Sequence, residues 1–437
     1  MKDSKYNLAI FGHAKHGKST LGGRLAYEFG AVSKVQLKRF EEKSAKFGKD
    51  FNKFNYIFLQ RNPAVWQKEK DTIGDSSRTS FPEFSNINVT DKSRLTLVDT
   101  PGHRDYISNL IYGAYLADQA ILTIAANTGI EDVTIEVIKS LISFDVPILS
   151  IVVTKMDIVN YSENIYLDII DELRELLETE FSLSLKQVCQ NIIPISALKN
   201  IGITRVNDEI NWYKGDTLID SIKGNKFYKV NEESKSRFIV EGAKDIYNVE
   251  SVGVVVVGTL ETGTLKKDDK LILEPASTIE NKTIEYKIKS IQNAKSVTDI
   301  KIDEDSEKYE ARSILSILFS SVSYYELKKQ LKRGGIFGIS RCRVARRIVA
   351  DINFFKDIKV YQGQEFILHS NASYTLVRLK KFDQSVSNKK RDVVECELEL
   401  VQPIAMESKE VNQQLSKFIL RKDKSVIGCG ICKTIVE

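Results

Sequence analysis

The stretch Gly12-His13-Ala14-Lys15-His16-Gly17-Lys18-Ser19-Thr20 directly follows the apolar run Leu8–Phe11. It fits the pattern GxxxxGK[ST] between a predicted strand and a predicted helix. The two glycines allow backbone N–H groups to turn toward an anion, and the helix N-terminus adds positive potential. Lys18 can then reach the outer phosphates of a nucleotide, and the Ser19 hydroxyl can bind Mg²⁺. The stretch therefore predicts a phosphate-binding loop, or P-loop.

Length and composition indicate a multidomain protein. At 437 residues the chain is too long for one ordinary core. Its composition, 42% hydrophobic and 28% charged, is typical of soluble globular proteins. No apolar run approaches the ~20 residues that span a bilayer, and Met1–Lys5 lead into a strand without a signal peptide's apolar segment. We therefore expect a cytoplasmic, monomeric protein with no membrane partner.

The five cysteines are scattered, which argues against a disulfide framework and for a reducing compartment. Cys429 and Cys432 have CxxC spacing, which is typical of a metal or redox site. They lie, however, in a predicted terminal strand, where residues three apart face opposite sides. We interpret this segment as a core strand.

Two basic clusters stand out against a net charge of only +5. Residues 31–70 contain ten basic and four acidic residues, and Lys328–Arg347 contains eight basic residues and no acidic one. Such clusters commonly neutralise phosphates, although a solvated face is an equally good interpretation of each.

The first half alternates short β-type runs with helical patterns, which predicts a doubly wound parallel α/β sheet. A helix is expected over residues 166–177, where apolar residues recur at helical spacing. From Phe238 onward, short turn-punctuated strands predict two antiparallel β-barrels. We expect a P-loop domain over residues 1–225 and barrels over 235–338 and 339–437. The predicted strands are 8–11, 95–98, 120–125, 148–153, 192–195, 252–258, 270–273, 284–291, 314–319, 346–352, 364–369, 372–380, 393–400 and 425–436.

Three further motifs follow predicted strands of the α/β domain. Asp99, in Asp99-Thr100-Pro101-Gly102-His103, can hold Mg²⁺ through a water while the Gly102 N–H contacts a γ-phosphate. The two carboxylate oxygens of Asp157, in Thr154-Lys155-Met156-Asp157, match the adjacent N1–H and N2–H₂ donors of guanine. Lys155 can cover the base, and Ser196-Ala197-Leu198 can offer a backbone N–H to the guanine O6. These motifs predict GTP/GDP and Mg²⁺ as ligands, with His103 orienting the attacking water.

The residues expected to contact the nucleotide are Gly12, His13, Ala14, Lys15, His16, Gly17, Lys18, Ser19, Thr20, Asp99, Gly102, Thr154, Lys155, Asp157, Ser196, Ala197 and Leu198. The expected metal ligands are Ser19 and, through a water, Asp99.

The P-loop and the Asp99–His103 motif resemble the translational GTPases of the elongation factor Tu and elongation factor 1-alpha family. The likeness extends to Tyr27–Phe54, to Val249–Leu273 and to Arg421–Val436. It implies a GTPase domain and two β-barrels that carry aminoacyl-tRNA to the ribosome, with an exchange factor as a possible partner. It also implies an acceptor-stem surface near Lys332 and Arg333.

Three departures from the family pattern indicate a divergent member. The family's Arg-Gly-Ile-Thr is absent from switch I, where residues 68–80 stand instead. The resemblance implies that a threonine of this segment binds Mg²⁺. Spacing from Asp99 favours Thr79 for it, and counting forward from the preceding helical segment favours Thr72. Lys15 replaces an Asp that resembles a ligand for a monovalent cation, and we hypothesise that its ammonium takes that cation's place. Thr154 replaces the Asn of NKxD, which predicts weaker base binding with guanine specificity kept by Asp157. Hydrolysis is expected to be slow, differently gated or ribosome-activated.

Two alternatives to an aminoacyl-tRNA carrier remain at this point. One is a nucleotide-gated adaptor that binds a release, rescue or RNA-decay partner. The other is the GTPase regulatory subunit of a sulfate-activating enzyme, which shares this architecture.

Overall fold

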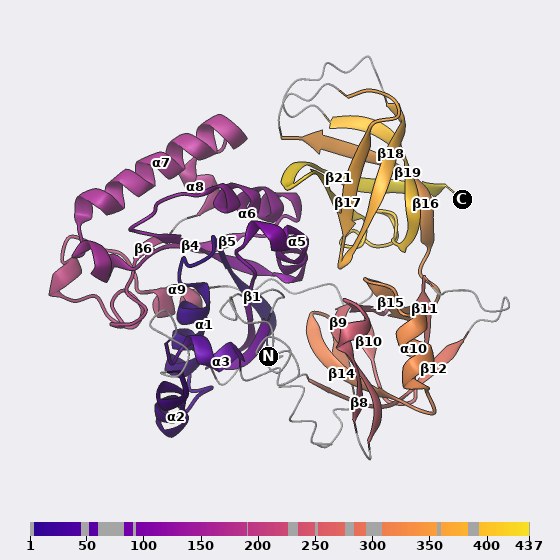
Figure 1. Ribbon diagram of the computed structural model, residues 1–437, viewed down its shortest axis with the longest axis horizontal. Coiled ribbons are helices and arrows are strands. Elements are labelled where there is room, and N and C mark those ends of the chain that lie inside the picture. The colour runs from indigo at the N-terminus through magenta and orange to yellow at the C-terminus, as the bar shows by residue number, and fades with distance from the viewer. Residues whose placement is uncertain are drawn as a thin grey trace. The chain divides into compact units, whose positions relative to one another are not determined.

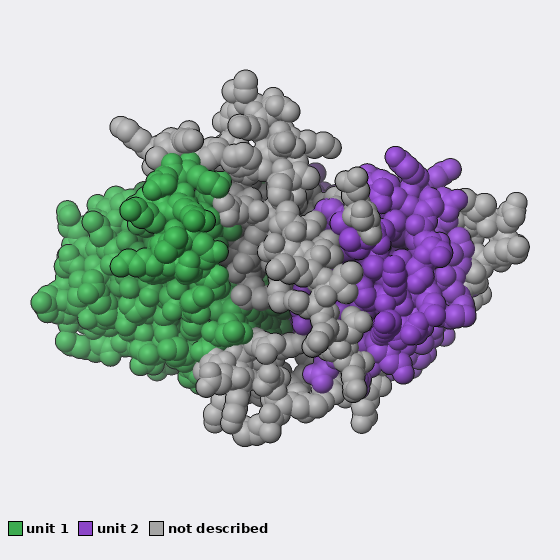
Figure 2. Space-filling model, turned by 90° about the horizontal axis from the view of Figure 1, so that it is seen from below, with its two compact units in different colours: residues 1–228, 296–298 green, residues 229–295, 299–437 purple. Residues whose placement is uncertain are grey.

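The structure is a computed structural model of the whole chain. It describes residues 4–44, 52–59, 83–90, 93–189, 191–225, 235–249, 252–275, 284–293, 308–355, 360–382 and 393–436. The chain forms two compact units, residues 1–228 with 296–298 and residues 229–295 with 299–437 (Figure 2).

The first unit is built on a six-stranded sheet with the order β2-β3-β1-β4-β5-β6. Neighbours from β3 to β6 run parallel, whereas the edge strand β2 runs antiparallel to β3. The predicted doubly wound parallel sheet is confirmed, and one antiparallel edge strand joins it where β2 and β3 follow each other in sequence and form a hairpin-like pair. The strands are β1 (Ser4–Gly12), β2 (Glu83–Thr90), β3 (Ser93–Asp99), β4 (Gln119–Ala125), β5 (Ile148–Thr154) and β6 (Asn191–Pro194).

Helices cover both faces of this sheet (Figure 1). Helices α1 and α9 contact one face, and α5 and α6 contact the other. The helices are α1 (Lys18–Glu28), α2 (Lys34–Ser44), α3 (Asn55–Leu59), α5 (Ile107–Leu116), α6 (Asp132–Ser143), α7 (Glu163–Phe181), α8 (Leu185–Val188) and α9 (Leu218–Gly224). The amphipathic helix expected over 166–177 is confirmed within α7, whose buried residues recur at helical spacing.

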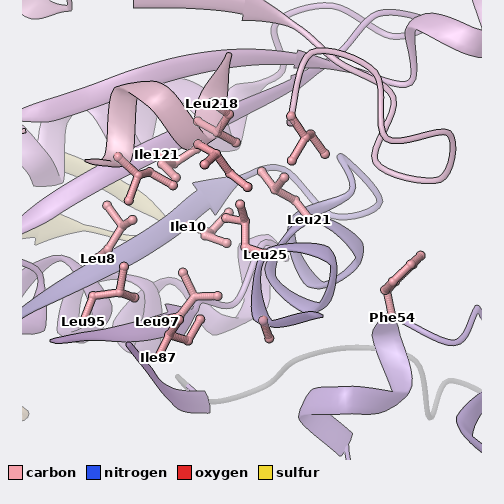
Figure 3. Close-up of a cluster of buried hydrophobic side chains, with 14 of the residues drawn as sticks. Leu8, Ile10, Leu21, Leu25, Phe54, Ile87, Leu95, Leu97, Ile121 and Leu218 are labelled. Carbon is pink, nitrogen blue, oxygen red and sulfur yellow. The ribbon is translucent and has the colours of Figure 1, made fainter. Parts of the chain in front are cut away.

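Alternation along β1 explains how the core forms. Leu8 and Ile10 face the same side of the sheet because strand side chains alternate, and they join a buried cluster. Leu21 and Leu25, four residues apart on α1, complete that cluster (Figure 3). This packing fixes α1 against β1 and thereby positions the loop that connects them.

The second unit contains two closed antiparallel barrels. In the first barrel, strands pair in the order β14-β12-β11-β15-β7-β9, β9 closes onto β14, and β8 adds to β9. Its elements are β7 (Arg237–Val240), β8 (Ile246–Val249), β9 (Gly253–Thr262), β10 (Thr264–Leu265), β11 (Lys270–Glu274), β12 (Glu285–Asn293), β13 (Tyr309–Glu310), β14 (Ser313–Phe319), α10 (Tyr324–Gln330) and β15 (Gly335–Gly338).

The other barrel closes in the order β16-β19-β18-β17-β20-β21. Its strands are β16 (Val344–Phe354), β17 (Glu365–Ser370), β18 (Ser373–Phe382), β19 (Val393–Ala405), β20 (Lys417–Lys422) and β21 (Ser425–Val436). Cys429 and Cys432 both lie on β21, one partly exposed and one buried, so the core-strand interpretation is confirmed.

A buried ion pair joins the two barrels. The Arg237 Nε of β7 donates to Glu407 at 2.8 Å, and the two side chains are only 1% and 4% exposed. The Asn412 amide also donates to the Thr262 hydroxyl of β9 at 3.2 Å.

The predicted fold class, an α/β P-loop domain followed by two antiparallel barrels, is confirmed. Within the described residues, no helix has the length and apolar character needed to cross a membrane.

Candidate nucleotide-binding site

The P-loop connects β1 to α1, as its sequence predicts. Gly12 has φ 147°, and a Cβ atom there would lie 2.2 Å from the Thr123 hydroxyl oxygen. Gly17 has φ 85° and is the N-cap residue of α1. Gly12 therefore requires glycine because a side chain has no room there, and both Gly12 and Gly17 require it because their backbone φ is positive. The loop brings backbone N–H groups and the α1 N-terminus together, which is the arrangement that binds phosphate.

Lys18 is buried within this loop. Its ammonium donates to the His13 carbonyl oxygen at 2.7 Å. Burial lowers the pKa of Lys18 to about 8, although the nearby Asp99 carboxylate raises it. A buried ammonium held mainly by a neutral carbonyl would gain strongly from a phosphate.

Ser19 and Asp99 meet at the end of β3. The Ser19 hydroxyl donates to Asp99 Oδ2 at 2.6 Å, and Asp99 is fully buried. A hydroxyl and a carboxylate beside a phosphate-binding loop are the hard oxygen ligands that Mg²⁺ prefers, so these residues fit that ion. Both candidates for the remaining ligand, Thr72 and Thr79, lie outside the described residues.

The segment after Asp99 packs directly against the P-loop. A Cβ atom on Gly102 would lie 2.7 Å from the Gly12 carbonyl oxygen and 2.9 Å from the Ala14 nitrogen. Next to it, His103 is partly exposed and caps the 3₁₀ turn η2 (Arg104–Tyr106). The Asp105 N–H lies 3.2 Å from His103 Nδ1 and the Asp105 carboxylate lies 3.3 Å from the same nitrogen, so Asp105 orients the ring.

The two remaining motifs meet at the ends of β5 and β6. The Met156 N–H donates to the Ile195 carbonyl oxygen at 3.1 Å, which ties the two loops together. Asp157 follows in the 3₁₀ turn η3 (Met156–Val159) and is partly exposed. Ser196 is buried, and its hydroxyl accepts from the Lys199 N–H at 3.3 Å. All four sequence motifs therefore lie at the carboxyl edge of one sheet, where ligands bind in α/β folds.

Comparison with known families agrees with this geometry. Residues 3–238, more than half of the chain, match the elongation factor Tu GTP binding domain. The chain belongs to this family. Residues 347–433 also match the GTP-eEF1A C-terminal domain-like family, so the chain is a translational GTPase of the elongation factor 1-alpha type. The predicted resemblance is thereby confirmed.

Relatives of this elongation factor family align over nearly the whole chain. Elongation factor 1-alpha of Pyrococcus horikoshii is 28% identical over 98% of this chain and 97% of its own length. Two solved structures have the same fold at less than 20% identity. The SelB elongation factor of Methanococcus maripaludis, with a GTP analogue, has TM-score 0.70 at 19% identity, covering 100% of this chain and 80% of its own. The GTP-bound Ski7 GTPase-like domain of S. cerevisiae has TM-score 0.78 at 18% identity, covering 99% and 97%.

Thr154 shows how this elongation factor relative accommodates its departure from NKxD. The Thr154 side chain is buried and its hydroxyl donates to the His16 carbonyl oxygen at 2.8 Å. The threonine therefore braces the P-loop from the end of β5. Sequence reasoning placed Thr154 at the base, and it did not foresee this contact with the P-loop backbone.

Arg24 is a positioning residue that sequence reasoning missed. From α1 it donates to the Ala197 and Leu198 carbonyl oxygens, both at 2.8 Å. Its guanidinium also lies 4.2 Å from the centre of the Phe54 ring. Arg24 thus holds the loop expected to contact the guanine O6. No motif marks it, since the two carbonyl oxygens that it holds lie more than 170 residues away.

Other predicted residues have more limited contacts. Lys15 has φ 64° and an exposed side chain, and Leu198 is also exposed. Lys332 is exposed just before the last strand of the first barrel. Arg333 instead donates to the Ala372 carbonyl oxygen of the second barrel at 2.8 Å, so it also connects the barrels.

Proposed function

We propose that this chain binds and hydrolyses GTP and, when GTP-bound, carries aminoacyl-tRNA to the ribosome in the cytoplasm. The observation that carries the proposal is the alignment with elongation factor 1-alpha over 98% of this chain and 97% of the relative. The likeness thus includes both barrels as well as the GTPase domain, which favours a shared carrier function over a shared nucleotide site alone.

Each part of the nucleotide site has a separate role in this proposal. Lys18 and the P-loop N–H groups bind the phosphates, and Asp157 selects guanine. Ser19, Thr79 and, through a water, Asp99 would hold Mg²⁺, which would supply positive charge beside the phosphates, with Thr72 as the alternative to Thr79. His103 uses Nε2 to orient the attacking water, a role supported by the contacts with Asp105 that orient the ring through Nδ1.

Protection of the aminoacyl ester tests the carrier proposal. Charged tRNA is incubated with the protein and either a GTP analogue or GDP, and spontaneous ester hydrolysis is followed. We expect protection with the GTP analogue alone. An Asp157→Asn variant, which loses one carboxylate acceptor for guanine, should lose this protection at limiting nucleotide. Absence of protection despite tight GTP binding in the same sample would instead favour the nucleotide-gated protein adaptor.

Ribosome-stimulated hydrolysis tests the role of His103. A His103→Ala variant should bind GTP normally and lose roughly 10²- to 10⁴-fold in turnover, the usual contribution of a positioned proton-transfer group. Its matched control is Arg104→Met, which removes an exposed neighbouring side chain that contacts Asp132 and keeps the contacts of the His103 ring. Equal turnover in the His103→Ala variant and the control would contradict the assignment.

A further inference from the structure

Two P-loop histidines converge on one carboxylate from another part of the chain. Glu131 Oε2 lies 2.8 Å from His13 Nδ1 and 2.6 Å from His16 Nε2. All three ligand atoms lie within 4.8 Å of one another. Glu131 follows β4 and is the N-cap residue of α6. The cluster therefore links the P-loop to the β4–α6 connection.

The tautomer of His16 leaves a lone pair facing the carboxylate. His16 Nδ1 lies 3.2 Å from the Thr123 carbonyl oxygen, which can only accept, so Nδ1 carries the proton. In this tautomer of the neutral ring, the Nε2 lone pair faces the Glu131 carboxylate oxygen. The Thr128 hydroxyl lies 3.1 Å from His16 Nε2 and can donate to it. Nε2 and the Glu131 oxygen nevertheless remain in direct contact.

The Glu131 side chain does not cap α6, although Glu131 is the N-cap residue of that helix. A side-chain acceptor at an N-cap normally binds an N–H group of the first turn, yet the Glu131 side chain makes no such bond in α6. It turns instead toward the histidines, where His13 Nδ1 also lies 3.0 Å from the Ala14 carbonyl oxygen. His13 Nδ1 and His16 Nε2 therefore each lie beside oxygen atoms, an arrangement that a bound cation stabilises.

We propose that His13, His16 and Glu131 bind a divalent transition-metal ion of the zinc class. Two imidazole nitrogens and one carboxylate oxygen form a ligand set that zinc sites use, with a fourth position left for water. Imidazole selects zinc, cobalt or nickel over magnesium. The Thr123 carbonyl oxygen supplies the outer hydrogen bond that orients a metal-binding histidine. The site shares no ligand with the Mg²⁺ site at Ser19 and Asp99.

Such an ion would cross-link the P-loop to the start of α6. The His16 carbonyl already accepts from Thr154 of β5, so the loop would then be held from two neighbouring strands. A metal that binds the folded chain raises its melting temperature by mass action. The ion is therefore expected to stabilise the P-loop whether or not the chain carries tRNA.

Titration with Co²⁺ tests the site directly, using the full chain with GDP and excess Mg²⁺. We expect one equivalent to bind, with visible absorption typical of nitrogen and oxygen ligands, displacement by Zn²⁺ and a rise in melting temperature. Glu131→Gln preserves shape and should weaken binding at least about tenfold, because even outer-sphere changes cost that much. Asp132→Asn, the neighbouring exposed carboxylate, is the matched control and should bind Co²⁺ like the unaltered chain.

Folding of the variants is checked by their melting temperatures without metal, and Glu131 tolerates substitution because it is 35% exposed. A His13→Asn variant, changing a side chain that is 28% exposed, provides a second test. The proposal is overturned if no saturable binding occurs, if Glu131→Gln binds as tightly as Asp132→Asn, or if thiolate-to-cobalt absorption places the ion on cysteines.

Discussion

Lys18 and Arg237 are both buried cations, but their surroundings differ. The Arg237 guanidinium, between the barrels, donates to the Glu407 carboxylate and to the backbone carbonyls of Ser236 and Ser340. Lys18, in the P-loop, has one hydrogen bond among the described residues, to the neutral His13 carbonyl. Burying a charge is costly unless a partner compensates it. A fully compensated cation therefore stabilises the fold, whereas an incompletely compensated one marks where an anionic ligand binds.

The largest effect should come from breaking the compensated pair. Arg237→Met leaves the Glu407 carboxylate buried without its cation, so the free energy of unfolding should fall by about 3–5 kcal/mol. Urea denaturation of the full chain measures this change. Nucleotide affinity should be unaltered, because Arg237 belongs to the barrel unit.

The double variant Arg237→Met/Glu407→Leu provides the control. Removing both charges takes away the uncompensated carboxylate, so most of the lost stability should return. A double variant no more stable than Arg237→Met would show that packing, and not charge compensation, governs this site.

Lys18→Met should weaken nucleotide binding without lowering stability, the opposite of the result expected for Arg237→Met. The nucleotide loses a charge-assisted hydrogen bond of about 1.5–3 kcal/mol, so the Kd for GDP should rise roughly 10- to 150-fold. The unfolding free energy of the nucleotide-free chain should not fall, because Met removes the desolvation penalty. Calorimetric titration and denaturation measure the two quantities.

Lys139→Met is the matched control for Lys18→Met. Lys139 is also buried, but its ammonium lies 3.0 Å from the Glu136 carboxylate. The control should lose stability and keep its affinity for GDP. The comparison between fully and incompletely compensated cations fails if Lys18→Met instead destabilises the chain as Lys139→Met does.

The pH dependence of GDP binding sharpens the same comparison. Burial lowers the pKa of Lys18 from its ordinary 10.5 to about 8, so the nucleotide-free chain loses this proton above pH 8. The folded chain then holds fewer protons than the unfolded chain, and Lys18's unfavourable contribution to stability is relieved as pH rises from about 8 to 10.5.

GDP affinity should move the other way over the same pH window. Phosphate restores the ammonium, so the Kd for GDP should rise by up to about tenfold per pH unit above pH 8. Titrations from neutral pH to pH 9.5 measure the slope, and Lys18→Met should remove it. A Kd that does not change with pH in the unaltered chain would contradict the role assigned to this buried ammonium.

The phosphate-binding site around Lys18 could be predicted from the sequence, whereas the Arg237–Glu407 ion pair could not. The P-loop requires glycine, lysine and serine at fixed local spacing, so its chemistry is visible in nine consecutive residues. The apolar run Leu8–Phe11 likewise predicted β1, and the short turn-punctuated runs after Phe238 predicted the two barrels. The Arg237–Glu407 pair spans 170 positions, and nothing near either residue indicates its partner. The antiparallel direction of β2 is hidden in the sequence for a related reason, since strand direction depends on pairing and not on composition.

Glu131 and Arg24 show that contacts between residues distant in sequence also shape the candidate site. Each contacts a predicted loop from an element more than 100 residues distant, so motif spacing could not reveal it. The motifs identify groups that touch the ligand. The residues that hold those groups in place depend on the tertiary structure.

Arg24→Met should produce the smallest effect. The variant removes the hydrogen bonds to the Ala197 and Leu198 carbonyl oxygens, each worth about 1 kcal/mol, and loosens the loop expected to bind the guanine O6. The Kd for GDP should therefore rise roughly fivefold. Inosine diphosphate keeps O6 and lacks the 2-amino group that Asp157 is expected to bind, so its Kd should rise by the same factor. A ratio of the two Kd values that changes in Arg24→Met would mean that Arg24 supports the Asp157 side of the base pocket instead.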